Sequence, residues 1–198
     1  MAMQKVQIIS FALSLLGKKP IVSLDNQSDI VGAAQQAFDF LLPSVISKHQ
    51  WRFAVKILQL SKLVETPPVT DWKYIFQLPS DYKKLIRLYP QNYLYEVYNN
   101  SVLYTNIDGP LYIEYQIEPT VSQLPDYFNH YFAYCIAEAL ALSNAHSVSF
   151  SNKLFQDKEA YLAQALAADA QNRPNQGIQS MPMITNRALG YPGAYGQR

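Results

Sequence analysis

The sequence predicts an α+β fold, in which a four-helix, bundle-like domain carries a small inserted antiparallel β-sheet or sandwich and is followed by an extended C-terminal tail. Apolar residues recur at three- and four-residue steps early in the chain and again after its middle, which is typical of amphipathic helices. Between these stretches the apolar period falls to two and turn residues separate short runs, which is typical of strands. The predicted organisation is a helical domain from residues 1–56 and 120–172, a β domain from 57–119 and the tail from 173–198.

The composition is that of a chain able to bury a core, because 49% of its 198 residues are hydrophobic. Its 15 tyrosines are unusual beside a charged share of only 16%. Tyrosine is enriched both in β-sheets and where protein meets protein, and both explanations can hold together. The formal net charge of +1 excludes a polycation built to grip nucleic acid.

The first helix is predicted from Gln4 to Leu16, with apolar residues on one face. Gly17 follows it as a left-handed C-terminal cap would require, and Pro20 prevents its continuation. A short link leads to the next helix, so the two are expected to pack antiparallel as a hairpin.

The second and longest helix is predicted from Ser28 to Lys56, with Ser28 or Asp29 as its N-terminal cap. Pro43 interrupts the pattern, so we expect a kink near Phe38 to Pro43 or two helices that meet there. The stretch ends in Trp51-Arg52-Phe53. Large aromatic residues at a helix end are typical of a core plug, and Trp51 and Phe53 are predicted to fix the junction between helices and sheet.

The middle of the chain predicts five or six short strands in an antiparallel meander or small sandwich. Asn99 and Asn100 tolerate positive φ, so the residues around them are predicted to form a tight hairpin. The predicted strands are Ile57–Leu63, Tyr74–Leu78, Lys84–Tyr89, Tyr93–Tyr98, Val102–Thr105 and Leu111–Ile117.

Two more helices complete the predicted bundle. Tyr127 to about Asn144 is apolar nearly all round, which predicts a position at the centre of the bundle. Ser147 to Asn152 is predicted to be a polar break, with Ser151 capping a fourth helix over Lys153 to about Asn172.

No catalytic, metal or cofactor site is predicted. The histidines His49, His130 and His146 are far apart, and a zinc site needs closely spaced Cys or His pairs. The chain has no glycine-rich phosphate loop and no nucleophile elbow. Glu114 and Glu118 lie at the end of a strand, where carboxylates are expected to face solvent. We therefore expect a protein that is not an enzyme.

The location signals are equally sparse. No window approaches the roughly 18 uncharged apolar residues of a bilayer-crossing helix, and no signal peptide is recognisable, so we expect a soluble chain without a membrane anchor. Cys135 is the single cysteine and is expected to be a buried thiol in a protein that folds in a reducing compartment.

One cluster could be interpreted as a nucleic-acid platform: Lys48, Arg52, Lys56 and Lys62, with Trp51 and Phe53 between them. Stacking on bases would need exposed aromatic rings in a basic groove. Because Trp51 and Phe53 also complete the apolar stripe of the helix, a core position is the favoured interpretation. A nucleic-acid-binding or other protein-interaction module without catalysis remains the alternative function.

Four stretches in colinear order resemble a known family. The stretches are Ala12–Ile21 (ALSLLGKKPI), Gln50-Trp51-Arg52-Phe53, Tyr74–Tyr82 (YIFQLPSDY) and Leu124-Pro125 before an aromatic-rich helix. By the order and spacing of these stretches, the chain is similar to the tail tubular protein A (head-to-tail adaptor, or gatekeeper) family of T7-like short-tailed phages over roughly residues 5 to 170.

The resemblance implies a structural protein of the virion tail, assembled in the host cytoplasm. Identical subunits would form a ring, expected to be a dodecamer, between the portal protein and the tail nozzle protein. DNA would pass through the ring without sequence-specific binding. Lys48, Arg52 and Lys56 would contact the channel or a neighbouring subunit. The Pro-, Gly- and Tyr-containing tail departs from the family, and Tyr191, Tyr195 and Arg198 are its candidate contacts with a subunit or the portal.

Overall fold

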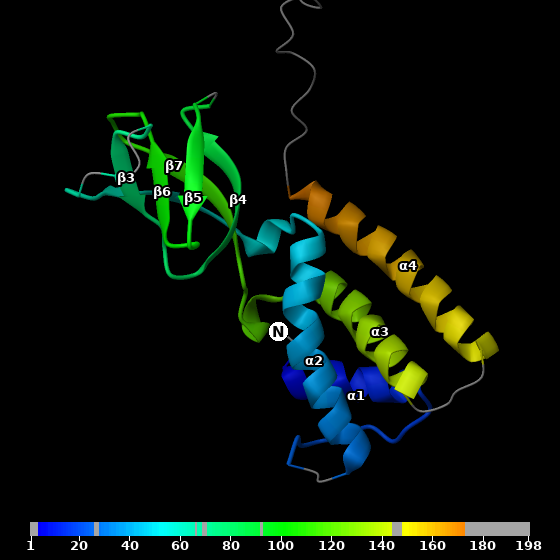
Figure 1. Cartoon of the computed structure of the whole chain (residues 1–198). Helices are drawn as coiled ribbons and strands as arrows, with labels where there is room; N and C mark the ends of the chain where they lie inside the picture. Colours follow the sequence, from blue (N-terminus) through cyan, green and yellow to red (C-terminus); the bar gives the residue numbers. More distant parts are fainter. Residues whose placement is uncertain are drawn as a thin grey trace, which may run out of the picture.

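A computed structural model shows an α+β fold, with four helices and two small antiparallel sheets in the part it describes, which confirms the predicted fold class (Figure 1). The predicted tail at 173–198 lies outside the described residues, so its extended form stays a prediction. The structure describes residues 4–25, 28–65, 67–68, 71–91, 93–143 and 148–172.

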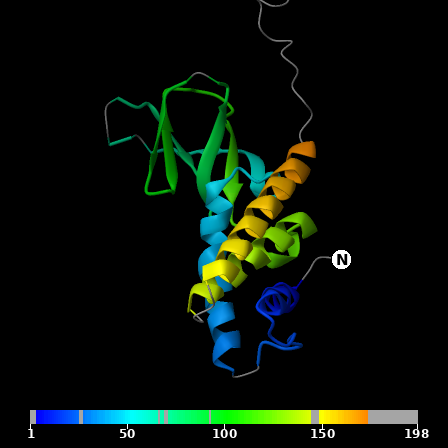
Figure 2. The same ribbon diagram turned by 90° about the vertical axis from the view of Figure 1, so that its right-hand side faces the viewer.

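Helix α1 spans Lys5–Leu15, and Gly17 behind it has a φ of 70°, the left-handed conformation predicted for this cap. The predicted hairpin with the next helix is wrong. α1 lies across α2 and α3 at a steep angle (Figures 1 and 2). Its Phe11 ring contacts His130 and Tyr134 of α3, so aromatic packing on α3, rather than the short link, sets the direction of α1.

Helix α2 spans Asp29–Lys48 and ends eight residues before the predicted end at Lys56. The reason is that His49 adopts an extended conformation, and a single 3₁₀ turn, η1 (Arg52–Ala54), leads directly into strand β1 (Val55–Gln59). The helix runs as one element through Pro43, not as two helices. Pro43 is exposed, so the carbonyl that it deprives of a donor lies where water can reach.

By length and composition α2 is apolar enough to cross a membrane, contrary to the expectation from the sequence. In the structure its apolar face instead contributes Val31, Phe38 and Val45 to the core of the helical bundle. Such composition is also that of the core helix of a globular bundle.

Helices α3 (Asp126–Ser143) and α4 (Val148–Gln171) complete the bundle. α3 lies at its centre, where Phe128, Phe132 and Ile136 are fully buried. α4 begins five residues before the predicted start at Lys153, so Ser151 lies inside the helix and does not cap it. Phe150 packs against the helical core, and this contact extends the helix toward its N-terminus.

The strands form two sheets, with the order β1-β7-β4 in one and β2-β3-β6-β5 in the other. The predicted strand over Ile57–Leu63 is wrong as one element, because it divides at Leu60 between the two sheets. Leu60 is buried, and its N–H donates to the Leu111 carbonyl. The remaining strands are β2 (Ser61–Lys62), β3 (Tyr74–Gln77), β4 (Tyr82–Tyr89), β5 (Tyr95–Tyr98), β6 (Val102–Thr105) and β7 (Tyr112–Ile117).

The hairpin between β5 and β6 forms as predicted. Asn99 and Asn100 have φ values of 50° and 52°, which match the left-handed pair of a two-residue turn. The two strands pair in antiparallel register from Tyr98 opposite Val102 onward.

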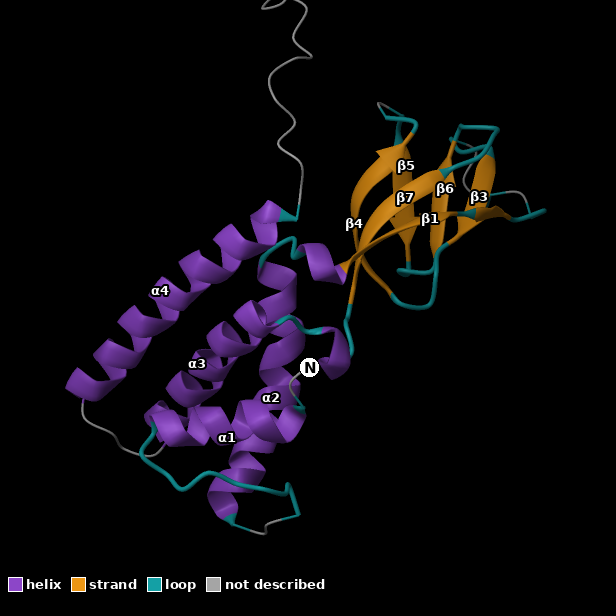
Figure 3. Cartoon of the chain, turned by 180° about the vertical axis from the view of Figure 1, so that it is seen from behind, coloured by secondary structure: helices purple, strands orange, loops and turns teal. Residues whose placement is uncertain are grey.

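The helices lie to one side of the strands (Figure 3), and each of these two parts has its own hydrophobic core. One lies among the four helices, and the other lies between the two sheets around Phe76, Leu103 and Ile113. The described chain between β1 and β7 belongs to the sheets, and the helices lie before and after it in sequence. The predicted domain boundaries at 56 and 120 stay a prediction.

Candidate interaction surface at the helix–sheet junction

Trp51 lies at the centre of the junction between the two cores. Its side chain is fully buried, and its ring lies 5.1 Å from Phe128 and 6.2 Å from Tyr131, both on α3. The indole N–H donates to the Val45 carbonyl of α2 at 3.4 Å. Phe53, two residues later, is half-buried and packs edge-on against Phe128. Because Trp51 exposes no surface, it cannot stack on a nucleic-acid base.

Asp169, near the end of α4, holds the same junction from the other side. Its carboxylate accepts a hydrogen bond from the Arg52 backbone N–H at 2.9 Å and another from the Tyr127 hydroxyl at 2.7 Å. Asp169 is buried, so both donors replace lost water. Burial, reinforced by the Asp169 contact, raises the pKa of Tyr127 well above its usual value.

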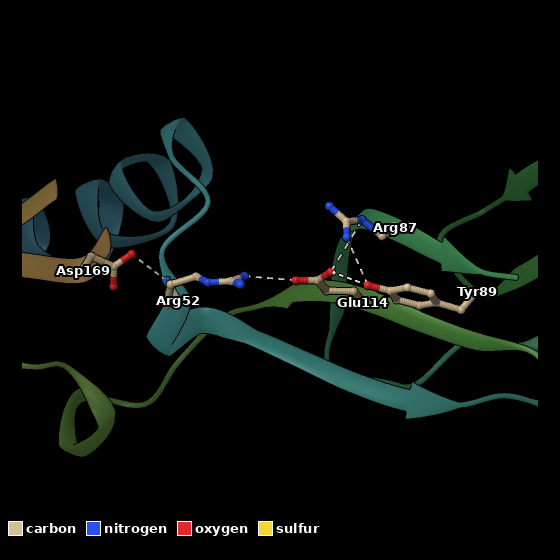
Figure 4. A network of polar contacts seen from close by, with 5 residues as sticks. All are labelled: Arg52, Arg87, Tyr89, Glu114 and Asp169. Atoms are coloured by element: carbon tan, nitrogen blue, oxygen red, sulfur yellow. Dashed lines mark hydrogen bonds and ion pairs between the residues drawn. The ribbon is translucent and has the colours of Figure 1, made fainter. Parts of the chain in front are cut away.

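Glu114 of β7 receives the Arg52 side chain on the outer face of the three-stranded sheet (Figure 4). Arg52 Nη1 lies 3.0 Å from Glu114 Oε1, and Arg87 Nε lies 3.9 Å from Oε2. The Tyr89 hydroxyl also donates to Oε2, at 3.4 Å. The side chain of Glu114 is only 7% exposed, so the expectation of a solvent-facing carboxylate is wrong. The two arginines that pair with Glu114 come from η1 and β4, which are distant in sequence, so no local sequence pattern predicts this contact.

Gln116, two residues further along β7, joins the sheet to the end of α2. Its amide Nε2 donates to the carbonyls of Ile46 at 2.7 Å and His49 at 2.8 Å. A helix leaves its last carbonyls without partners inside the helix, so this amide takes the place of a C-terminal cap. Gln116 is not among the residues predicted from the sequence, although the period of two along the strand places its side chain on the same face as that of Glu114.

The predicted contact residues divide into three groups. Lys48 is exposed, whereas Arg52 and Lys56 are held in ion pairs within the chain, Lys56 with Asp81 Oδ2 at 2.7 Å. A contact of these three residues with a channel or neighbour stays a prediction. Tyr191, Tyr195 and Arg198 lie outside the described residues.

Two surface pockets flank the junction. One, of about 400 Å³, is lined by Arg52, Phe53, Val55, Ile57, Glu114 and Asn172. The other, of about 370 Å³, lies between α2 and the strands β4 and β7 and is lined by Pro43, Ile46, Ser47, Lys83, Lys84, Gln116, Ile117 and Glu118. The junction thus presents recesses on its surface.

Large exposed apolar side chains are numerous on the strands. Ile57 is 65% exposed and Tyr112 41% exposed, both on the three-stranded sheet. Tyr93, Leu94 and Tyr95 form a second exposed run at β5, the edge strand of the other sheet. Exposed apolar residues that gather on sheet edges are typical of surfaces that bind protein.

Two titratable side chains beside the three-stranded sheet, Asp81 and Tyr115, form hydrogen bonds within the chain. The hydrogen bond from Lys56 holds the pKa of Asp81 below its usual value, and burial with the hydrogen bond to Asp81 raises the pKa of Tyr115 to about 12. Among the residues that the structure describes, no group of three His, Cys, Asp or Glu side chains could hold a metal ion. At the junction, polar contacts connect the helices to the three-stranded sheet, and exposed apolar side chains lie on the strands nearby.

Comparison with known protein families finds no match for this chain, and comparison with curated proteins finds none either.

Proposed function

We propose that this chain is a structural protein of a short-tailed phage virion, an adaptor subunit whose ring joins the portal to the tail nozzle and lines the DNA channel. One observation carries the proposal. Two of the four stretches that resemble the tail tubular protein A family lie at the joints between the helices and the sheets of this fold. Gln50 to Phe53 forms the helix–sheet junction, and Leu124-Pro125 leads from the sheets back into α3.

The joint explains how such a subunit would work. A ring that connects two larger assemblies must keep the orientation of its two parts while force passes through it. Here β1 and β7 both connect to helices, and the Arg52 and Gln116 contacts tie the sheet to α4 and α2. A subunit built in this way can present helices to one partner and strands to another with a defined angle between them.

The exposed apolar residues support a role in contacts between proteins. A ring of identical subunits uses a head-to-tail interface, which needs two different patches on each copy. The β5 edge with Leu94, 80% exposed, and the α2 surface with Phe40, also 80% exposed, are two such separate patches.

The test is ring formation on the portal. The purified full chain is mixed with portal rings of the phage that encodes it and imaged by electron microscopy. We expect a second ring, dodecameric and coaxial with the portal. Leu94→Asp should weaken assembly with no loss of folding, because position 94 is exposed, and Glu65→Gln serves as a surface control. Failure of the unaltered chain to bind portal overturns the proposal.

Measuring the affinity for free DNA distinguishes the adaptor from the alternative function, a nucleic-acid-binding module. Such a module binds free DNA tightly as an isolated subunit, and its affinity falls steeply with salt. The adaptor is expected to bind free duplex weakly or not at all. Tight, salt-sensitive binding together with no binding to portal would favour the alternative.

A further inference from the structure

The pocket lined by Arg52 lies beside the C-terminal end of α4. Asn172, the residue after the last helical residue Gln171, is itself part of the pocket lining. The chain that follows therefore starts at the rim of a recess of about 400 Å³.

The floor of this pocket is the outer face of the three-stranded sheet. The register pairs Val55 with Gln116 and Ile57 with Glu114, which places all four side chains on one face. Ile57 is 65% exposed there, and Tyr112 continues the face beyond it. Covering apolar surface of this kind is favourable, because it removes that surface from water.

The charges around the pocket are already paired. Arg52 and Arg87 contact Glu114, and Asp169 accepts from the Arg52 backbone, so two positive and two negative side chains give a formal sum of zero. A buried, paired carboxylate leaves no charge that would select a charged ligand. The pocket therefore suits an occupant that is apolar and uncharged.

The segment that follows α4 is uncharged from residue 174 to residue 186, and apolar side chains are spaced along it among polar ones. Residues 174–186 read PNQGIQSMPMITN, with no charged side chain and with Ile178, Met181 and Ile184 at intervals. An extended chain covers at most about 3.3–3.6 Å per residue, so Ile178 can reach roughly 20 Å from Asn172. That reach is ample for a pocket that Asn172 itself lines.

We infer that residues 174–186 dock on the outer face of the three-stranded sheet of the same chain, with the Ile178 side chain over Ile57. The segment covers exposed apolar surface, and its tether to Asn172 supplies a high effective concentration. β1 is an edge strand, so its outer backbone groups are also available to an extended segment. The inference does not depend on the proposed function, because it concerns a single chain.

Disulfide trapping in the full chain tests it. Ile57→Cys is combined with Ile178→Cys, and the matched control combines Leu58→Cys with Ile178→Cys. Leu58 is the next residue of the same strand, points to the opposite face and is 44% exposed. Native Cys135 is buried and can stay in place. Dilute protein is oxidised mildly and the bonds are mapped by mass spectrometry.

The expected result is an intrachain bond that forms at least about tenfold faster for the position-57 pair than for the position-58 pair, because docking favours one face. Equal rates for the two pairs would overturn the inference. A bond that joins two chains in place of the intrachain bond would also overturn it, because the segment would then dock on a second copy.

Alkylation gives an independent readout. In the Ile57→Cys protein, the thiol introduced at position 57 is expected to react about tenfold more slowly than when Ile178→Asp is added, because the charged side chain disfavours docking. Leu58→Cys, with and without Ile178→Asp, should show no difference. An unchanged rate at position 57 would contradict the docking.

Discussion

Asp169 accepts a hydrogen bond from the backbone N–H of Arg52, and so joins the end of α4 to the turn between helix and sheet across 117 residues of sequence. The oxygen–nitrogen distance is 2.9 Å, and the second carboxylate oxygen accepts from the Tyr127 hydroxyl. Asp169 is 5% exposed, so both donors would be left without water if the carboxylate were removed.

Asp169→Ala is therefore expected to lower the free energy of unfolding by about 2–3 kcal/mol, since hydrogen bonds to charged groups contribute the most. Urea unfolding measures the change. Tyr127→Phe, which removes only one of the two donors, should cost less. An equal loss in both variants would mean that the Arg52 bond contributes nothing.

Trp51→Ala is expected to lower the free energy of unfolding by about 3–5 kcal/mol, because the truncation leaves a cavity among fully buried rings. Trp51→Phe fills part of that space and should cost less. Denaturant unfolding followed by circular dichroism measures both. A Trp51→Ala protein that folds normally but fails to assemble would place Trp51 at an interface instead.

Glu114→Gln is expected to destabilise the protein by about 1–2 kcal/mol, because a buried carboxylate that forms ion pairs with two arginines loses its charge. The matched control is Glu118→Gln, four residues later on the same chain segment. The Glu118 side chain is 40% exposed in its pair with Lys83, so its removal should cost less than about 1 kcal/mol. Equal losses would contradict the role assigned to the Glu114 contacts.

Asp81 should contribute to acid sensitivity. Its pKa is lowered in the folded protein, chiefly by the hydrogen bond from Lys56, so its stabilising effect is present above the unfolded pKa of about 3.9. That effect is lost as the pH falls through the lower folded pKa. Asp81→Asn should remove this part of the pH dependence when Tm is measured between about pH 2 and 6.

The change at Asp81 should be modest at neutral pH, about 1 kcal/mol or less, because both side chains of the pair are partly exposed. Asp39→Asn is the control, because the Asp39 side chain is 66% exposed in its ion pair with Lys5 and its replacement should cost less than about 1 kcal/mol. An Asp81→Asn protein with an unaltered acid limb would contradict the prediction.

Cys135 should be unreactive in the folded protein. Burial raises the pKa of its thiol to about 11, and only the thiolate reacts with alkylating reagents. At pH 8 we expect slow labelling of the native chain and rapid labelling in denaturant, followed by mass spectrometry. Rapid labelling under native conditions would show that α3 opens locally at this position.

The element types and the core aromatics were predictable because they depend on neighbours in sequence. Apolar residues on nearly every side of α3 predicted its central position, and the Asn99-Asn100 pair predicted the hairpin, because each signal acts over a few residues. Trp51 was recognised as a core residue from the apolar stripe in which it lies. The overall order of helices and strands followed from the same local signals.

The junction was not predictable in this way. Ending α2 at Lys48 depends on Gln116 and Asp169, which are more than 60 residues away in sequence. Dividing the first strand at Leu60 depends on the backbone hydrogen bond that Leu60 donates to the Leu111 carbonyl, and the burial of Glu114 depends on arginines from η1 and β4. None of these partners is visible in a local window.

The sequence by itself therefore determined an α+β chain with core aromatic residues close behind its second helix, because propensity and periodicity act between near neighbours. Only the tertiary structure decided where that helix stops and which polar residues are buried beside it. The physical reason is that a buried carboxylate or amide is tolerated only where its partners converge. For Asp169, Glu114 and Gln116 those partners come together only once the helices and the sheet have packed.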